Sequence, residues 1–283
     1  MAHLFKKAFG LLFRDPKTLR WHLRIRLLRG CCALFSRSGF YLQGKMDLDP
    51  KCWWHNPDFL AASGGWIIPG DPVKRAVLAL EPWDTVRRDM IILLLRSLVE
   101  RAVEGDLAEL GVFRGNTARL IHHYLPERKL YLFDTFAGFD ERDVRIEGAQ
   151  TGRKTRTAEF SETNVEMARK YIAPQNDNVQ FFPGYFPESA PEFLRQRKFA
   201  LAHLDADLYE PMLAGLNYFY DKVVPGGIIL AHDFNSWPGA RKAVQDFFRD
   251  KPEIPLPMPD KSGSALIIKQ GVIGQAGATP MGR

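Results

Sequence analysis

The feature that most constrains the fold is a pair of short apolar runs, residues 199–204 and 228–231. A segment of helix length separates them, and Pro225, Gly226 and Gly227 interrupt the chain before the second run. Short continuous apolar runs with this spacing are typical of buried parallel strands joined by a crossover helix. The pair therefore predicts an α/β fold built on a mostly parallel sheet.

Four side chains that can bind a cation follow these two predicted strands. Asp205 and Asp207 come after the first strand, and His232 and Asp233 come after the second. Because ligands of open α/β sheets bind beyond the carboxyl ends of the strands, we expect these side chains to gather at one rim. Carboxylate oxygens and imidazole nitrogens are ligands of divalent cations. The alternative is that Asp205 and Asp233 only cap the helices that follow, which leaves the pairing at each strand end unexplained.

The length of the chain, 283 residues, suits one large domain with additions at its ends. We predict a basic amphipathic N-terminal arm over residues 1–46 and an irregular connector rich in Trp and Pro over residues 47–83. The main domain is expected over residues 84–272, followed by a disordered tail at 273–283. Within the domain, residues 135–160 are polar and contain glycine, so they are predicted to form a structureless lid over the site.

Positive charge is concentrated in the arm of residues 1–46. The arm holds ten Lys and Arg residues against one acid, a net charge of +9, whereas the whole chain carries +6. A basic amphipathic arm suits an anionic membrane surface, and it equally suits packing on its own domain or a contact within a homo-oligomer. We expect no nucleic-acid partner, because no aromatic-interleaved binding motif accompanies the charge.

Other features of the composition bear on the compartment. No apolar run reaches the length of a membrane span or of a signal-peptide core. The three cysteines, two of them adjacent, imply no disulfide framework and fit a reducing compartment. We therefore expect a cytoplasmic protein, with peripheral association at the inner membrane surface if the arm binds lipid.

A glycine-containing loop follows an earlier predicted strand, residues 106–111. Its signature, Glu109-x-Gly111-x-x-x-Gly115, lies before a helix, where glycines let a ligand approach the backbone and its free N–H groups. The four-residue glycine spacing differs from the dinucleotide fingerprint and argues against NAD. Asp134 ends the next strand and is placed to accept hydrogen bonds from ribose hydroxyls. Together they predict a nucleoside ligand, and the alternative is a tight turn with a helix N-cap.

Five segments resemble, in sequence and in order, the macrocin O-methyltransferase family. They are ELGVFRG at 109–115, FDTFAGF at 133–139, FPGYF at 182–186, LDADLYE at 204–210 and PGG at 225–227. This family comprises S-adenosylmethionine- and magnesium-dependent sugar methyltransferases of macrolide and aminocoumarin pathways. The resemblance covers roughly residues 84–250. It implies a class I methyltransferase fold, Rossmann-like, with a seven-stranded, mostly parallel sheet and helices on both faces.

The resemblance also implies roles for individual residues. Around the S-adenosylmethionine cofactor it places Glu109, Gly111, Gly115, Asp134, Phe136 and Gly184, and we assign the adjacent Tyr185 to the same site. Asp205, His232 and Asp233 would hold Mg²⁺ or a similar divalent cation, and Asp207 would be the general base. Better-known antibiotic members carry Asp-Asp where this chain has His232-Asp233. Histidine softens the site for Mg²⁺ and removes a negative charge, so either His232 binds an ion such as Mn²⁺ or Asp233 works with Asp205 alone.

We therefore predict a divalent-metal-assisted O-methyltransferase that acts on a hydroxyl of a sugar, a glycan or a glycosylated natural product. A cation lowers the pKa of a hydroxyl, and a nearby carboxylate then removes its proton. The alternative acceptor is a catechol-like or other vicinal diol, for which Trp53, Trp54 or Trp237 could line an aromatic pocket. An alternative of another class is a non-catalytic, membrane-associated scaffold with a vestigial cofactor pocket.

Overall fold

The structure is a computed structural model that describes residues 77, 80, 84–173 and 178–271. The predicted arm, nearly all of the connector and the C-terminal tail lie outside the described residues. In the part that is described, no helix has the length and apolarity that crossing a bilayer requires.

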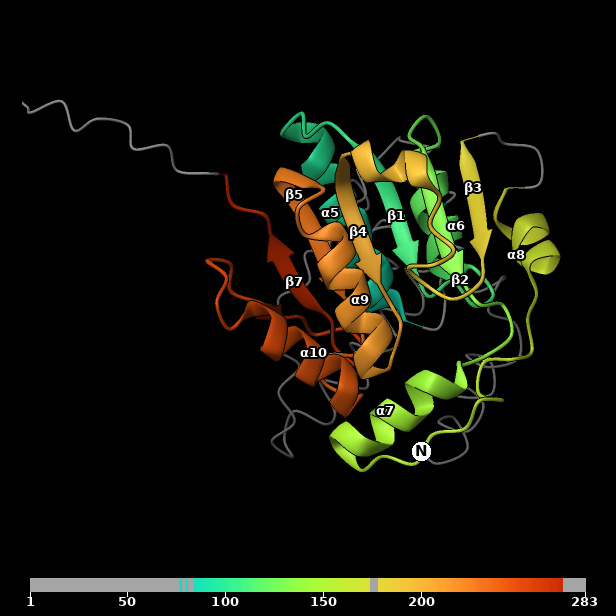
Figure 1. The fold of residues 1–283 in the computed structure, drawn as a ribbon. Helices are drawn as coiled ribbons and strands as arrows, with labels where there is room; N and C mark the ends of the chain where they lie inside the picture. Colours follow the sequence, from blue (N-terminus) through green and yellow to red (C-terminus); the bar gives the residue numbers. More distant parts are fainter. Residues whose placement is uncertain (1–76, 78–79, 81–83, 174–177, 272–283) are drawn as a thin grey trace, which may run out of the picture. The chain divides into compact units, whose positions relative to one another are not determined.

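The centre of the body is a mixed sheet with the order β3-β2-β1-β4-β5-β7-β6 (Figure 1). Its strands are β1 (Asp106–Leu110), β2 (Leu130–Asp134), β3 (Val179–Pro183), β4 (Phe199–Leu204), β5 (Val223–Ala231), β6 (Leu256–Pro257) and β7 (Ala265–Ile268). The first five pair in parallel, whereas β7 runs antiparallel to both β5 and β6. The expected seven-stranded, mostly parallel sheet is thus confirmed.

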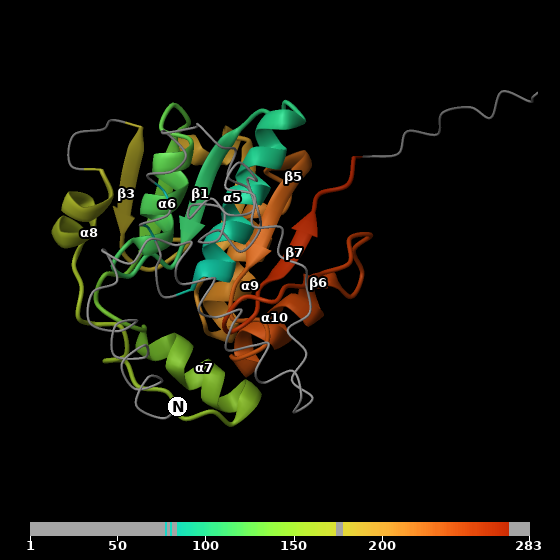
Figure 2. The same cartoon turned by 180° about the vertical axis from the view of Figure 1, so that it is seen from behind.

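Helices cover both faces of this sheet. They are α5 (Thr85–Glu100), α6 (Asn116–Tyr124), α7 (Glu141–Thr151), α8 (Val165–Ile172), α9 (Tyr209–Phe219) and α10 (Pro238–Phe248), with the 3-10 helix η4 (Glu192–Gln196). Helices α9 and α10 lie on the face that Figure 1 presents, and α5, α6 and α8 lie on the face seen in Figure 2. The fold is therefore a three-layer α/β arrangement.

Side chains alternate between the two faces along each strand, so one sheet packs against a layer of helices on each face. In β4, Leu201 packs in the cluster with α5 and α6, whereas Ala202 and Leu204 pack in the cluster with α9 and α10. Every residue of β4 is buried, as expected for a central parallel strand. The continuous apolar run that predicts this strand thus reflects burial on both faces.

The strand order reverses between β1 and β4, which are neighbours at the centre of the sheet. Their register pairs Leu110 with Leu204, so the loops after these strands start side by side. In open α/β sheets such a switch point forms the ligand-binding crevice. Helix α7 lies beyond the carboxyl ends of the strands in both views (Figures 1 and 2).

The prediction that residues 135–160 lack regular structure is wrong, because they contain α7, whereas their role as a lid stays a prediction. The side chain of Asp140 accepts a hydrogen bond from the Arg142 amide and caps the helix, and Gly152, at φ 74°, ends it. Apolar spacing did not reveal this helix because the two side chains that it buries are Asp143 and Glu147. Its inner face is polar.

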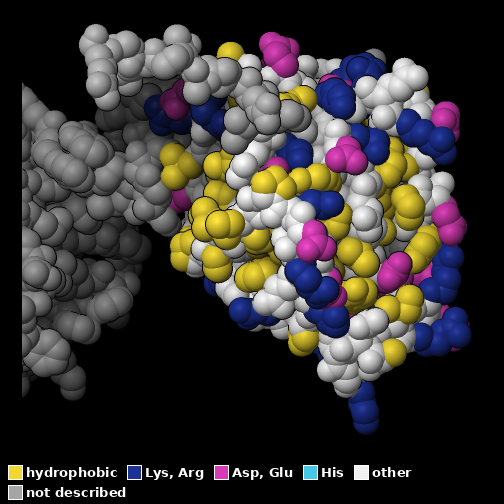
Figure 3. Space-filling model, turned by 60° about the vertical axis from the view of Figure 1, so that its left-hand side comes forward, with side chains coloured by type: hydrophobic (Ala, Val, Ile, Leu, Met, Phe, Trp, Pro, Cys, Tyr) yellow, Lys and Arg dark blue, Asp and Glu magenta, His cyan; other side chains and the backbone are white. Residues whose placement is uncertain are grey.

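One of the two edges of the sheet is formed by β6, which is two residues long and contains Pro257. A short edge strand with proline discourages pairing with another chain. Figure 3 turns the β7 side of Figure 1 forward and shows apolar side chains interspersed with charged ones. Ile254, Leu256 and Ile268 are exposed at this edge.

Candidate active site

A cavity of about 380 Å³ lies at the carboxyl ends of the central strands. Its walls come from the loops after β1, β2, β3, β4 and β5 and from the start of α7. All but one of the predicted site residues line it: Glu109, Gly111, Gly115, Asp134, Gly184, Tyr185, Asp205, Asp207, His232 and Asp233. The volume falls within the range of small-molecule sites.

Phe136 is the exception among the predicted site residues. Its side chain is buried in the hydrophobic core and does not line the cavity. Its φ is 52°, and its amide donates a hydrogen bond to Asp134 Oδ1 at 2.6 Å. Phe136 thus supports the site through its backbone, and its assignment to the cofactor stays a prediction.

The glycine loop after β1 is shaped by its neighbours. Gly111 adopts φ 87°, and a Cβ atom there would collide with the carbonyl oxygen of Asp205. Gly115 is the N-cap of α6 at φ 88°, where a Cβ would strike the side chain of Ile172. Both glycines therefore allow the close packing of the loop. The tight turn with a helix N-cap, which was the alternative to a ligand-binding loop, is present, and the two glycines also line the cavity.

Asp134 holds the glycine loop in place. Its Oδ2 accepts hydrogen bonds from the amides of Val112 at 2.7 Å and Phe113 at 2.8 Å, and Oδ1 accepts the Phe136 amide. The Thr135 hydroxyl also lies 3.5 Å from Oδ1, but its closer acceptor is the Gly138 carbonyl at 2.5 Å, so one of the about four acceptor positions of the carboxylate remains for a ligand hydroxyl. Asp134, which is expected to bind the ribose, therefore also holds the glycine loop in place.

Glu109 and His203 form a buried pair on adjacent strands. Glu109 Oε1 lies 3.1 Å from His203 Nδ1, and the histidine is fully buried. Burial lowers the pKa of His203 to about 3, so its imidazole is neutral and donates from Nδ1. His203 is thus a packed core residue.

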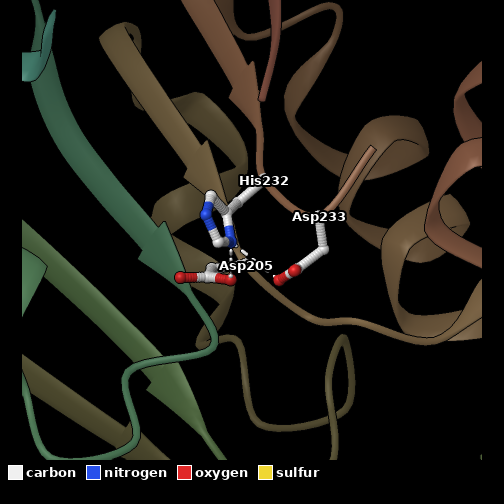
Figure 4. A group of neighbouring side chains, drawn as sticks. All are labelled: Asp205, His232 and Asp233. Carbon is white, nitrogen blue, oxygen red and sulfur yellow. Dashed lines mark hydrogen bonds and ion pairs between the residues drawn. The ribbon is translucent and has the colours of Figure 1, made fainter. Parts of the chain in front are cut away.

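Three predicted metal ligands converge at the ends of β4 and β5 (Figure 4). One ligand atom each from Asp205, His232 and Asp233 lies within 4.8 Å of the others. His232 Nδ1 is 2.8 Å from Asp205 Oδ1 and 2.7 Å from Asp233 Oδ2. Two carboxylates and an imidazole nitrogen form a donor set that fits a divalent cation.

Electrostatics in this cluster are dominated by opposite charges. Burial alone would lower the pKa of His232, but Asp205 and Asp233 outweigh it and raise the pKa to about 10. Burial would raise the pKa of Asp205, yet His232 and Arg87 hold it well below its usual range. Arg87 Nη2 contacts Asp205 Oδ2 at 2.5 Å.

Asp207 lines the cavity beside the cluster at φ 58°, and Asp233 has φ 60°. Left-handed backbone at a non-glycine residue is costly and is often found at functional sites. Burial, together with the carboxylates of Asp233 and Asp205, raises the pKa of Asp207 well above its usual range. The alternative role of Asp205 and Asp233 as helix caps is not seen, because the N-cap residues of α9 and α10 are Leu208 and Trp237.

Several residues of the cavity were missed in the sequence. Arg87 comes from the first turn of α5, and no sequence signal connects it to Asp205. Asp143 lies on α7, where its Oδ1 accepts a hydrogen bond from Tyr185 Oη at 2.8 Å. The aromatic lining contains Phe139 beside the predicted Trp237.

This sheet order, with a glycine loop after β1 and a site across the switch point, defines a class I S-adenosylmethionine-dependent methyltransferase fold. Two solved structures share the fold. The O-methyltransferase NovP aligns with a TM-score of 0.58 at 22% identity, covering 66% of this chain and 81% of that one. The calicheamicin methyltransferase CalS11 gives a TM-score of 0.51 at 23% identity, covering 70% and 86%.

The chain belongs to the macrocin O-methyltransferase family, whose model matches residues 85–267. It is 27% identical over 164 residues to demethyldecarbamoylnovobiocin O-methyltransferase of Streptomyces niveus, covering 54% of this chain and 62% of the relative. It is 26% identical over 206 residues to mycinamicin III 3''-O-methyltransferase of Micromonospora griseorubida, covering 66% and 80%. This chain therefore spans less than two thirds of the first relative's length.

Proposed function

We propose that this protein transfers the methyl group of S-adenosylmethionine to a hydroxyl of a sugar or glycoside, assisted by a divalent cation. The observation that carries the proposal is one cavity that is lined both by the glycine loop and Asp134 and by the acidic cluster. The family's named relatives, which are O-methyltransferases of glycosylated antibiotics, support the same chemistry.

In this proposal Glu109, the glycine loop, Gly184 and Asp134 bind the cofactor, with Tyr185 beside them. The backbone N–H groups at the start of α6 and the Asp134 carboxylate suit the polar groups of a nucleoside. The backbone amide of Phe136 helps to fix Asp134. These assignments concern binding and orientation of the methyl donor.

Asp205, His232 and Asp233 are the proposed metal ligands. A divalent cation bound there would lower the pKa of the acceptor hydroxyl and stabilise the developing alkoxide. Asp207, on the same side of the cavity, would take the hydroxyl proton, and the closed site would hold the acceptor in line with the methyl group. Asp207 therefore has to be ionised when the acceptor is bound, a state that the positive charges of the loaded site favour.

A vicinal diol of the catechol type is a second candidate acceptor, favoured by the aromatic lining. Phe139 and Trp237 meet edge to face with ring centroids 5.9 Å apart, and both line the cavity. Trp53 and Trp54 lie outside the described residues. A scaffold without catalysis is disfavoured because a vestigial pocket has no need of converging carboxylates.

The cofactor half of the proposal is tested by calorimetric titration of S-adenosylmethionine into the purified chain, first with Mg²⁺ and then with EDTA. We expect micromolar binding in both conditions, because the proposed cofactor residues are separate from the metal ligands. An Asp134→Asn variant should bind at least tenfold more weakly, since the glycine loop loses its anionic acceptor. No binding by the unmodified chain in either condition would support the scaffold.

A further inference from the structure

We propose that Asp143 and Tyr185 recognise the acceptor by hydrogen-bonding to hydroxyls of an uncharged sugar ring that lies against Trp237. This inference rests on the proposed function and adds to it the class of acceptor and the residues that select it. The inner face of α7 is unusual.

Helix α7 buries carboxylates where a surface helix ordinarily buries apolar side chains. Its two buried residues are Asp143 and Glu147, one turn apart on the same face. Val144 and Ile146 are only partly buried. Burying a carboxylate is costly unless the group is hydrogen-bonded or has a functional partner, so two on one face call for an explanation at each position.

Glu147 is explained by docking. Its Oε2 accepts a hydrogen bond from the Tyr209 amide at 2.9 Å, and its Oε1 accepts one from Thr151 at 3.0 Å. Gly239 leaves room for this carboxylate, which a Cβ atom at that position would strike. Glu147 thus fixes α7 at the start of α9, directly after the loop that carries Asp205 and Asp207.

Asp143 is left facing the cavity. Its carboxylate accepts a hydrogen bond from Tyr185 Oη at 2.8 Å, and both residues line the cavity. The guanidinium of Arg142 lies 3.6 Å from the centroid of the Tyr185 ring and holds that ring in place. Because the Tyr185 proton is donated to Asp143, the pair offers acceptors, the remaining carboxylate positions and the phenol oxygen, to the O–H groups of a pair of sugar hydroxyls.

The apolar wall of the same cavity suits the C–H face of a sugar ring. Phe113, Phe160, Phe139 and Trp237 form a chain of edge-to-face contacts with centroid distances of 5.3, 5.4 and 5.9 Å. All four residues line the cavity. The Arg153 guanidinium lies 3.6 Å from the centroid of the Trp237 ring and fixes the indole plane.

Charge selects among acceptors. The cavity is lined by seven carboxylates, from Glu109, Asp134, Asp140, Asp143, Asp205, Asp207 and Asp233, against three positive groups, from Arg87, Arg114 and the protonated His232. An anionic acceptor such as a nucleotide sugar would be repelled at its phosphates. A catechol would have both hydroxyls at the cation and none for Asp143. An uncharged sugar can present hydroxyls both to the cation and to Asp143.

The test measures methyl transfer from labelled S-adenosylmethionine to a panel of p-nitrophenyl hexosides and 6-deoxyhexosides, with catechol and UDP-glucose as contrasts. We expect the uncharged glycosides to be the best acceptors. Asp143→Asn should raise KM for the best glycoside about tenfold to a hundredfold, and Tyr185→Phe about threefold to tenfold. In both variants kcat should stay within about threefold, and in Asp143→Asn, a position outside the proposed cofactor residues, Kd for S-adenosylhomocysteine should be unchanged. Gln150→Ala, on the exposed face of α7, is the matched control.

Each contrary outcome is distinct. Faster methylation of catechol or UDP-glucose than of every glycoside overturns the inference, as does a protein that binds S-adenosylhomocysteine but methylates no glycoside. Variants that lose kcat at unchanged KM would make Asp143 and Tyr185 structural. Failure to bind S-adenosylhomocysteine would instead contradict the proposed function itself. If Asp143→Asn folds poorly, the same KM criterion applies to Tyr185→Phe.

Discussion

His232 Nδ1 lies 2.8 Å from Asp205 Oδ1, although the two residues end different strands. The same nitrogen is 2.7 Å from Asp233 Oδ2, so one imidazole bridges two carboxylates. With the pKa of His232 raised to about 10 by these neighbours, the bridge is positively charged at neutral pH. Position 232 therefore sets the charge of the proposed metal site.

The first prediction concerns this position. His232→Asp should strengthen Mg²⁺ binding about tenfold or more at neutral pH, because a hard, anionic oxygen ligand replaces a cationic imidazolium. The measurement is calorimetric titration of Mg²⁺, with His232→Asn as the control that removes the imidazole without adding charge. Weaker binding in His232→Asp than in the unmodified protein would show that the imidazole itself is needed as a ligand.

Asp207→Asn should lower turnover by about a hundredfold to ten-thousandfold, the usual loss when a general base is removed. Binding of S-adenosylhomocysteine and of Mn²⁺ should change little, because neither depends on the proposed base. Single-turnover kinetics and Mn²⁺ titration measure the two effects, with the exposed Asp221→Asn as a control. If Mn²⁺ affinity fell instead, Asp207 would join the ligands beside Asp233.

Glu147→Ala should loosen α7 from the body. The Tyr209 amide would lose its acceptor, which costs about 1–3 kcal/mol of local stability, whereas Glu147→Gln keeps an acceptor and should cost less. Amide hydrogen exchange of residues 141–151 reports the change directly. Equal protection in all three proteins would mean that Glu147 does not hold the helix.

Asp143→Asn should stabilise the protein at neutral pH. Burial is the main cause that raises the pKa of Asp143 to about 6, with Asp140 and Glu210 adding to it and Tyr185 and Arg142 opposing it. A folded pKa above the unfolded value means that ionisation costs stability as pH rises from about 4 through 6. The variant avoids this cost.

The expected gain in the free energy of unfolding is about 1–2 kcal/mol at pH 7.5, after solvent screening is allowed for, and near zero at pH 4. Urea denaturation at both pH values measures it. A variant that is less stable at pH 7.5, or equally stabilised at both, would contradict the buried and ionised state of Asp143. A gain in stability with a rise in KM is the expected signature of a residue kept for function.

Much of the fold was predictable because its strands are apolar runs and its helices carry ordinary signals. Residues 199–204 form β4 with the predicted boundaries. The strand β5 begins before the apolar run that predicts it, at Val223. The pairing of β5 with β4 shifts register between Val223 and Ile228, where Gly226 adopts φ 78°, and such an irregularity depends on the neighbouring strands.

The rest depends on contacts between residues that are distant in the sequence. The short elements η4 and β6 lack a periodic pattern, and α7 has an inner face that binds polar groups. The spacing of the apolar runs predicted that Asp205, His232 and Asp233 lie together, because the carboxyl ends of parallel strands meet at one edge of the sheet. It could not predict that Asp134 clamps the glycine loop, or that Arg87 reaches Asp205 from α5.

The most direct test of the central claim is methyl transfer from labelled S-adenosylmethionine to p-nitrophenyl glycosides, measured with Mg²⁺ or Mn²⁺ and again after EDTA treatment. We predict a methylated glycoside whose formation falls at least a hundredfold in EDTA and returns when the metal is restored. Transfer at the same rate in EDTA would contradict the role of the cation. Absence of transfer to any hydroxyl acceptor, with cofactor bound, would contradict the assignment as an O-methyltransferase of glycosides.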